Sequence, residues 1–386
     1  MKKLLLIFIL GIIVTQPLYA FAQEGELVMD KVETVKAQVL EVLDQEVKKV
    51  PGTDVTSNYQ TIKVQILQGT EKDKVITVTN DYLSLKKGEV FYLMHTTNSL
   101  DGRDMYSVSE PYRLPVVLFF VALFIALVFF FGGLQGIRGL VSLAGSLVLI
   151  LYVLIPGILH GYSPIFVSLG VASLIIILGS YVTHGFNKTT TSAVIGMVVT
   201  ILVTGVLAYI AVHWSRLSGF SDENAVYLNL NTRGSIDFVG LLLGGMLIGL
   251  LGVLYDVAIG QAISVEELHN IAPHISRVTI YKRAIRIGRE HIGALVNTLA
   301  IAYVGVSLPL LLLYSQSSTE SLSITLNREL FATEIIRTMI GSIGLVIAVP
   351  ITTIICVFLL MRKSGPVSQE KIEKERHALE HFEHHH

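Results

Sequence analysis

Long apolar runs with few charges fill the last two-thirds of this chain. Between residues 114 and 361 there are about seven such runs of 17 or more residues, each long enough to cross a hydrocarbon core of about 30 Å. Of the 386 residues, 52% are hydrophobic and only 15% are charged, where a soluble protein would have about 25% charged. We therefore predict a polytopic α-helical membrane bundle over residues 114–361. Its expected helices are 115–131, 139–156, 164–181, 190–212, 238–254, 292–314 and 334–361.

The first 22 residues have the pattern of a secretory signal peptide. Lys2 and Lys3 precede an apolar stretch over 4–14, and Ala20-Phe21-Ala22 supplies small residues at the expected cleavage positions. An uncleaved anchor is the alternative, but the apolar stretch is short for a membrane span. We predict cleavage after residue 22, and therefore export of the segment that follows.

Residues 23–113 are polar and alternate with the period of two that is typical of half-buried strands. Strand-like runs begin at Val35 and cover 61–67, 74–79 and 89–94, with turn residues such as Pro51-Gly52 and Lys87-Gly88 between them. Short strands at close spacing favour a small barrel or sandwich, with an OB-like barrel as one such arrangement. We expect an extracytoplasmic β-rich domain in which His95 is the only histidine.

Basic residues in the connections between the predicted helices set the orientation. Nine lie in the connections that would face the cytoplasm if the exported domain is outside, and three lie in the opposite connections. We therefore expect the N-terminal domain outside and the C-terminus in the cytoplasm of a bacterial cell membrane. The nine are Arg138, Lys188, Arg277, Lys282, Arg283, Arg286, Arg289, Arg362 and Lys363, and the three are Arg216, Arg233 and Arg328.

Four polar residues in or near the fifth and sixth helices are the candidate binding groups. Asp256 and Gln261 follow the fifth predicted helix, Glu290 precedes the sixth, and Asn297 lies inside it. Ionisable and polar side chains are costly inside a bilayer, so each is a candidate for ion or substrate binding. The alternatives are a solvated acid in the headgroup region for Asp256 and an interhelical hydrogen bond for Asn297.

The stretch 261–289 reads as the longest cytoplasmic loop. Ile263, Leu268 and Ile271 suggest an interfacial amphipathic helix, and the basic run 277–289 is expected to contact anionic headgroups. A docking surface for a cytoplasmic partner is the alternative. GxxxG pairs at Gly132 and Gly136 and in the glycine-rich fifth helix predict close helix packing, or a lining of a cavity.

The predicted cytoplasmic tail, residues 362–386, is rich in histidine. His377 and His381 would share a helix face and form a weak candidate metal site. Remnants of a purification tag explain the same residues.

Several classes of protein are disfavoured. The net charge of −1 gives no electrostatic reason for nucleic-acid binding, and the single Cys356 excludes an internal disulfide. The sequence has no Walker A loop, no HExxH and no GxSxG motif, so we expect neither an enzyme nor a cofactor.

Two blocks, 249–268 (GLLGVLYDVAIGQAISVEEL) and 288–310 (GREHIGALVNTLAIAYVGVSLPL), resemble the YibE/F-like family of bacterial membrane proteins. An exported β domain ending in a segment like 106–113 (YSVSEPYR) fits the same family, so the resemblance covers roughly residues 30–315. It implies that the positions of Asp256, Gln261, Glu290 and Asn297 hold equivalent polar residues in the family. It supports the membrane topology and names no substrate.

Our first hypothesis is a secondary transporter or permease for an ion or small solute, with its site between the fifth and sixth helices. The alternative is a membrane scaffold or sensor whose exported domain binds an envelope protein or ligand. In both cases the lipid bilayer is the principal partner.

Overall fold

The computed structural model describes residues 30–49, 56–81, 83–99, 101–221, 223–316 and 321–361. The predicted signal peptide and the histidine-rich tail, with His377 and His381, lie outside these residues. The chain divides into two compact units, Met1–Phe124 and Ile125–His386. Each unit is described by itself below.

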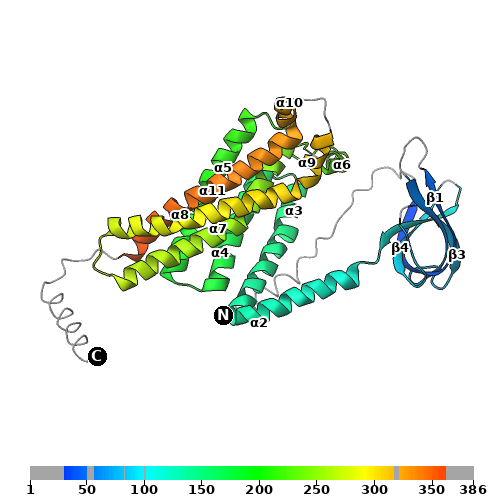
Figure 1. The fold of residues 1–386 in the computed structure, drawn as a ribbon, viewed down its shortest axis with the longest axis horizontal. Coiled ribbons are helices and arrows are strands. Elements are labelled where there is room, and N and C mark those ends of the chain that lie inside the picture. The colour runs from blue at the N-terminus through cyan, green and yellow to red at the C-terminus, as the bar shows by residue number, and fades with distance from the viewer. Residues whose placement is uncertain are drawn as a thin grey trace. The chain divides into compact units, whose positions relative to one another are not determined.

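The first unit contains an antiparallel sheet rolled into a half-barrel (Figure 1). The strands are ordered β3-β2-β1-β4-β5, so the long first strand pairs with β2 on one side and β4 on the other. Register shifts between Val39 and Glu41 and between Val42 and Asp44 mark irregularities of the kind that bend a strand. The strands are β1 (Lys31–Lys49), β2 (Thr56–Ile66), β3 (Val75–Asn80), β4 (Val90–Thr97) and β5 (Asp104–Pro111).

Alternation of apolar and polar residues produces the core of the half-barrel. Val35, Ala37 and Val39 point inward from β1 and are buried with Ile62 and Phe91 of the neighbouring strands. The predicted strand runs correspond to β1 to β4, whereas β5 was not among them. The expected β-rich domain is confirmed as a half-barrel sheet.

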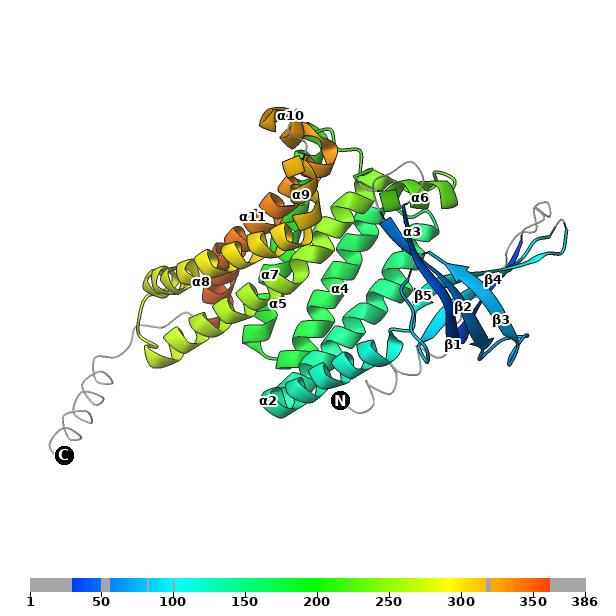
Figure 2. The ribbon, with the colours of Figure 1, turned by 45° about the vertical axis from the view of Figure 1, so that its right-hand side comes forward.

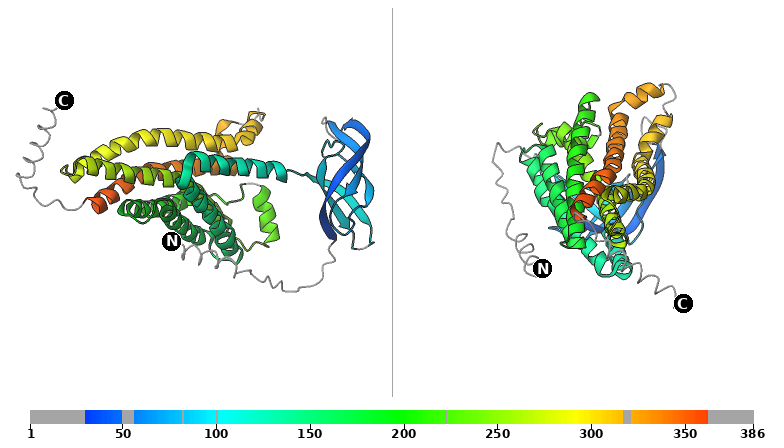
Figure 3. Two further views of the ribbon diagram at one scale, coloured as in Figure 1. Left: turned by 90° about the horizontal axis from the view of Figure 1, so that it is seen from below. Right: turned by 90° about the vertical axis from the view of Figure 1, so that its left-hand side faces the viewer.

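The second unit is a bundle of long helices. Figure 2 shows α4 and α7 side by side, and the right-hand view of Figure 3 shows α11 in orange between α5 in green and α8 in yellow. The helical elements, the first of which begins in the first unit, are α2 (Leu114–Leu149), the π-helical turn η1 (Ile150–Leu154), α3 (Ile155–Leu159), α4 (Pro164–His184), α5 (Lys188–Trp214), α6 (Glu223–Asn231), α7 (Phe238–Ile271), α8 (Arg277–Val306), α9 (Leu308–Gln316), α10 (Leu322–Asn327) and α11 (Glu329–Leu360).

Five helical stretches in the described chain are long and apolar enough to cross a membrane, and a sixth is present if α8 and α9, bent by 62°, form one span. These helices are consistent with a multi-pass membrane protein. The first stretch, Leu114–Leu159, has 46 residues and a length of about 69 Å, roughly twice a bilayer core. It breaks at Gly133, whose φ of 51° and ψ of −140° are not helical. If this stretch crosses the membrane twice, the chain must turn between the two spans, and Gly133 is a position where it could do so. The number of seven membrane-spanning helices stays a prediction.

The prediction that residues 261–289 form a long loop is wrong. Helix α7 continues to Ile271 and α8 already begins at Arg277, so only a short turn separates them. The three apolar positions attributed to an interfacial helix belong to α7, where Leu268 packs against the bundle while Ile263 and Ile271 are exposed. Tertiary contacts extend the helix past its most apolar segment, which hydropathy alone does not reveal.

Small residues allow α5 and α11 to pack closely. A Cβ atom at Gly196 of α5 would lie 2.6 Å from Thr352 Oγ1 and 3.0 Å from the Cα of that residue. On the other helix, a Cβ atom at Gly344 would lie 2.9 Å from Thr204 Oγ1. Such contacts replace the hydrophobic effect as the source of helix association in lipid.

Polar contacts also fix both ends of α11. At its start, the Glu329 carboxylate accepts hydrogen bonds from the backbone N–H groups of Ser218 (2.7 Å) and Gly219 (2.9 Å). At its end, Arg277 of α8 donates to the carbonyl of Met361 at 2.5 Å. One turn further along α11 from Glu329, Arg337 and Glu334 form an ion pair at 2.6 Å.

We expect Gly196→Ala to lower the free energy of unfolding by about 1–3 kcal/mol, because the new methyl group overpacks the α5–α11 contact. The matched control is Gly252→Ala, since a Cβ atom there would meet nothing within 4 Å. Thermal unfolding of the purified protein in detergent measures the difference. Equal melting temperatures for the two variants would contradict the tight contact.

Candidate functional site

Helices α7 and α8 run antiparallel, and two contacts define their register. Gln261 Nε2 donates to the carbonyl of Ala284 at 2.8 Å, and Tyr303 Oη lies 3.4 Å from the position of a Cβ atom at Gly249. Asp256 lies between these contacts on α7, and Glu290 lies between them on α8. The register therefore places the two acids at a similar depth along adjacent helices.

Asp256 lies on an exposed face of α7 that otherwise carries almost no side chains. Together with Asp256, the glycines at 245, 249, 252 and 260 share this face at spacings of three to four residues, which is the helical repeat. All but Gly249 have open space where a Cβ atom would be. The carboxylate of Asp256 therefore lies on a helix face where the backbone is accessible.

Glu290 and Asn297 share a face of α8, with Ala294 between them. All three are exposed, and no described residue forms an ion pair with Glu290 or a hydrogen bond with the Asn297 side chain. The interhelical hydrogen bond considered for Asn297 is therefore absent from the described part of the bundle. Three of the four predicted residues, Asp256, Glu290 and Asn297, lie on exposed surfaces of neighbouring helices.

Gln261 differs from the other three, because it is 3% exposed and joins three helices. Its amide nitrogen donates to Ala284 O of α8 and to Thr353 Oγ1 of α11, both at 2.8 Å. Thr353 in turn donates to Val349 O at 2.6 Å. The side chain is a structural link between helices.

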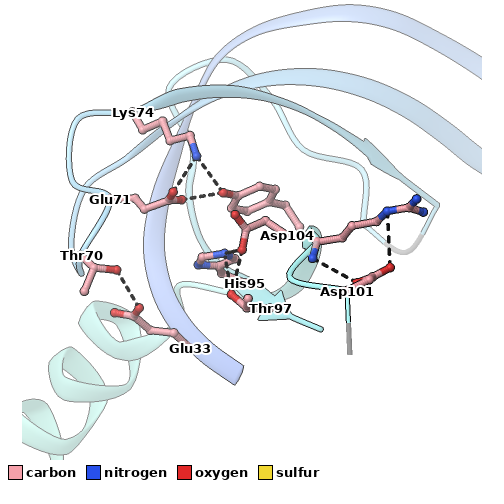
Figure 4. Close-up of polar contacts among 10 residues, drawn as sticks. Glu33, Thr70, Glu71, Lys74, His95, Thr97, Asp101 and Asp104 are labelled. Atoms are coloured by element: carbon pink, nitrogen blue, oxygen red, sulfur yellow. Dashed lines mark hydrogen bonds and ion pairs between the residues drawn. The ribbon is translucent and has the colours of Figure 1, made fainter. Parts of the chain in front are cut away.

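A polar network in the half-barrel was not predicted from the sequence. Figure 4 shows the His95 ring and the Asp104 carboxylate facing each other, with Nε2 2.8 Å from Oδ1. Thr97 Oγ1 donates to the same oxygen at 2.8 Å. The hydrogen bond from His95, followed by that from Thr97, holds the pKa of Asp104 below its ordinary value.

The network continues through Tyr106, whose ring stacks on His95 at a centroid distance of 4.7 Å. Tyr106 Oη donates to Glu71 at 2.6 Å, and Lys74 Nζ lies 2.6 Å from the same carboxylate. The hydrogen bonds from Lys74 and Tyr106 lower the pKa of Glu71. Because Tyr106 belongs to β5 and Lys74 immediately precedes β3, the network joins the two edges of the sheet.

Only the tertiary structure brings these residues together, since they lie up to 35 positions apart. The alternation that identifies the strands reveals only which side chains share a face. Within the described residues, no group of three or more histidine, cysteine, aspartate or glutamate side chains could hold a metal ion.

Two hollows flank Asn187, which caps the N-terminus of α5 by accepting a hydrogen bond from Thr190 N at 2.7 Å. None of the four predicted site residues lines either hollow. The smaller one has a volume of about 160 Å³ and is lined by His184, Asn187, Thr189, Thr190, Ile259, Ala262, Ile263 and Glu266.

We expect Gln261→Met to lower the free energy of unfolding by about 1–3 kcal/mol, because the variant keeps the volume but loses both hydrogen bonds. Asn297→Leu serves as the control, since the Asn297 side chain bonds to no described residue. Thermal unfolding in detergent compares the two. Unchanged stability of Gln261→Met would show that Gln261 is free for another role.

We expect acid to weaken the half-barrel partly through Asp104. Its folded pKa is lowered, so its contribution is present above the ordinary pKa of 3.8 and is lost as pH falls through the folded value. Calorimetry of wild type and Asp104→Asn from about pH 5 to about pH 2.5 should show a stability difference that closes with acidity. Asp101→Asn is the control, and a pH-independent difference would contradict the assignment.

The comparisons with known proteins concern mainly the second unit. No curated protein and no solved structure matches this chain. The sequence profile of the YibE/F-like protein family matches residues 120–362, which is more than half of the 386 residues. The match starts after the half-barrel and extends through the last helix, beyond the limit of about residue 315 expected from the resemblance. The chain therefore belongs to the YibE/F-like protein family.

Proposed function

We propose that this protein is a secondary transporter or permease for an ion or small solute in a bacterial cell membrane. The observation that carries the proposal is the pair of acids, Asp256 and Glu290, at a similar depth on adjacent helices. A cation is the species that two such carboxylates would bind. Neither acid is ion-paired with a described residue, so both are available.

The depth of Asp256 supports a site within the span. It lies 18 residues after Phe238, where α7 begins, which corresponds to about 27 Å along the helix axis. If the helix enters the membrane at Phe238, the carboxylate lies near the far side of a core about 30 Å thick. An acid at that depth is costly against lipid, and a water-filled groove or a bound cation would lower that cost.

The glycine face of α7 supports the same proposal. Gly245, Gly249, Gly252 and Gly260 leave backbone carbonyl groups accessible beside Asp256, and accessible backbone inside a membrane is tolerated where it lines a cavity or contacts protein. Asn297, about two turns beyond Glu290 on the same face of α8, adds a polar group along the proposed path. Gln261 is left out of this set because its amide links three helices.

In the proposed orientation the half-barrel is outside and the turn between α7 and α8 is in the cytoplasm. The excess of basic residues in the connections on that side supports it, as does the signal-like N-terminus. The basic first part of α8 would then lie near anionic headgroups.

The alternative is a scaffold or sensor whose half-barrel binds an envelope partner. The half-barrel has its own core, and its strand order with joined β3 and β5 edges agrees with an OB-like barrel. Such barrels bind extended ligands. The outer surface near Lys36, whose Nζ lies 4.2 Å from the ring centroid of Tyr112, offers a cationic and aromatic contact. Capture of a defined partner by the domain 23–113, with no flux through the membrane part, would favour this alternative.

We expect Asp256→Asn and Glu290→Gln each to reduce transport about tenfold or more, because loss of one charged ligand costs about 1.5–3 kcal/mol. Elemental content, measured by mass spectrometry in cells expressing wild type, each variant or an empty vector, would identify the transported ion. Glu267→Gln is the control, since Glu267 is an exposed acid of α7 outside the proposed set. Full activity of both site variants at equal membrane levels would overturn the site.

A further inference from the structure

The hollow of about 160 Å³ beside Asn187 lies where α4 ends, α5 begins and α7 passes. Its volume equals that of about five water molecules at roughly 30 Å³ each. Its walls combine apolar side chains of α7 with polar groups from the first turn of α5. It is separate from Asp256 and Glu290, and the inference drawn from it does not depend on transport.

Two hydroxyl groups in its wall have no partner. Thr189 is 7% exposed and Thr190 is 3% exposed, yet neither hydroxyl forms a hydrogen bond with any described residue. Thr191 and Ser192, which follow, donate to the carbonyls of Asn187 and Lys188 four residues earlier, at 2.8 and 2.7 Å. The corresponding carbonyls for Thr189 and Thr190 precede the helix. Both hydroxyl oxygens are accessible from the hollow, so a polar ligand there could accept hydrogen bonds from them.

The same helix end attracts negative charge. Asn187 accepts the N–H groups of Thr190 and Thr191, whereas those of Lys188 and Thr189 bond to no described acceptor. Free N–H groups and the positive end of the helix dipole together form an anion-binding arrangement. A carboxylate placed there would also accept from the two hydroxyls.

The other wall carries the opposite charge. Glu266 of α7 lines the hollow, and no basic side chain of the described residues forms an ion pair with it. A simple anion at the helix end would be repelled by this carboxylate, and a simple cation at Glu266 would be repelled by the helix end. A ligand with both charges avoids both penalties.

We propose that this hollow binds a small zwitterion of the amino-acid type. Its carboxylate would lie at the N-terminus of α5, against Thr189 and Thr190, and its ammonium group would lie against Glu266. The side chain of the ligand would contact the apolar wall formed by Ile259, Ala262 and Ile263. A zwitterionic lipid headgroup has the same pair of charges.

Calorimetric titration of the full-length protein in detergent tests the assignment with glycine and alanine as probes. Acetate and methylamine each carry one of the two charges, and we expect both to bind at least tenfold more weakly than glycine. Displacement of glycine by phosphatidylethanolamine, but not by phosphatidylglycerol, would support the charge pair and assign it to a headgroup.

Substitutions test separately the contributions of α7, through Glu266, and of α5, through Thr189 and Thr190, to glycine binding. We expect Glu266→Gln to weaken glycine binding at least tenfold and Thr189→Val and Thr190→Val to weaken it severalfold, while Glu267→Gln leaves it unchanged. Thermal unfolding checks that each variant is folded. If Glu266→Gln does not fold, the glycine binding of the threonine variants tests the proposal. Absence of glycine binding by the wild type, equal binding of acetate or methylamine, or loss of binding in Glu267→Gln would overturn the proposal.

Discussion

Close contact between backbones at small residues is the constraint on which the helical unit depends. Lipid tails are as apolar as leucine, so helices gain little by burying apolar side chains against each other and rely on packing and hydrogen bonds. Gly196 and Gly344 bring α5 and α11 together, and Gly244 brings α7 against Ser168 of α4. Larger residues at these positions would separate the helices and remove those contacts.

The polar side chains of the helical unit differ in whether the helix packing provides them with hydrogen-bond partners. Gln261 lies where α7, α8 and α11 meet, and its two hydrogen bonds hold them together. Asp256, Glu290 and Asn297 lie on faces that the described packing leaves open. Thr189 and Thr190 are buried but unpartnered because they occupy the first turn of a helix. Polar groups that packing has not satisfied are the ones available to a ligand.

The half-barrel is stabilised differently, because its sheet has edges to protect. The network of His95, Asp104, Tyr106, Glu71 and Lys74 joins the β3 and β5 edges through side chains. Part of this network consists of ion pairs on the surface, and their strength changes with pH. The close packing of α5 and α11 depends instead on the fit between small residues. The two units are therefore expected to differ in their response to acid.

The sequence by itself determined the helical class, the existence of the N-terminal strands and most helix starts, because hydropathy and alternation are local signals. It also identified the small-residue positions on α7, but not which of them pack: Gly240 and Gly244 contact α4, while Gly245 and Gly252 remain open. Only the tertiary structure decided that 261–271 continues α7, that Gln261 is a link rather than an exposed ligand, and that Thr189, Thr190 and Glu266 share one hollow. Each of these depends on which residues of other helices lie nearby, and the periodicity of a single segment carries no information about its neighbours.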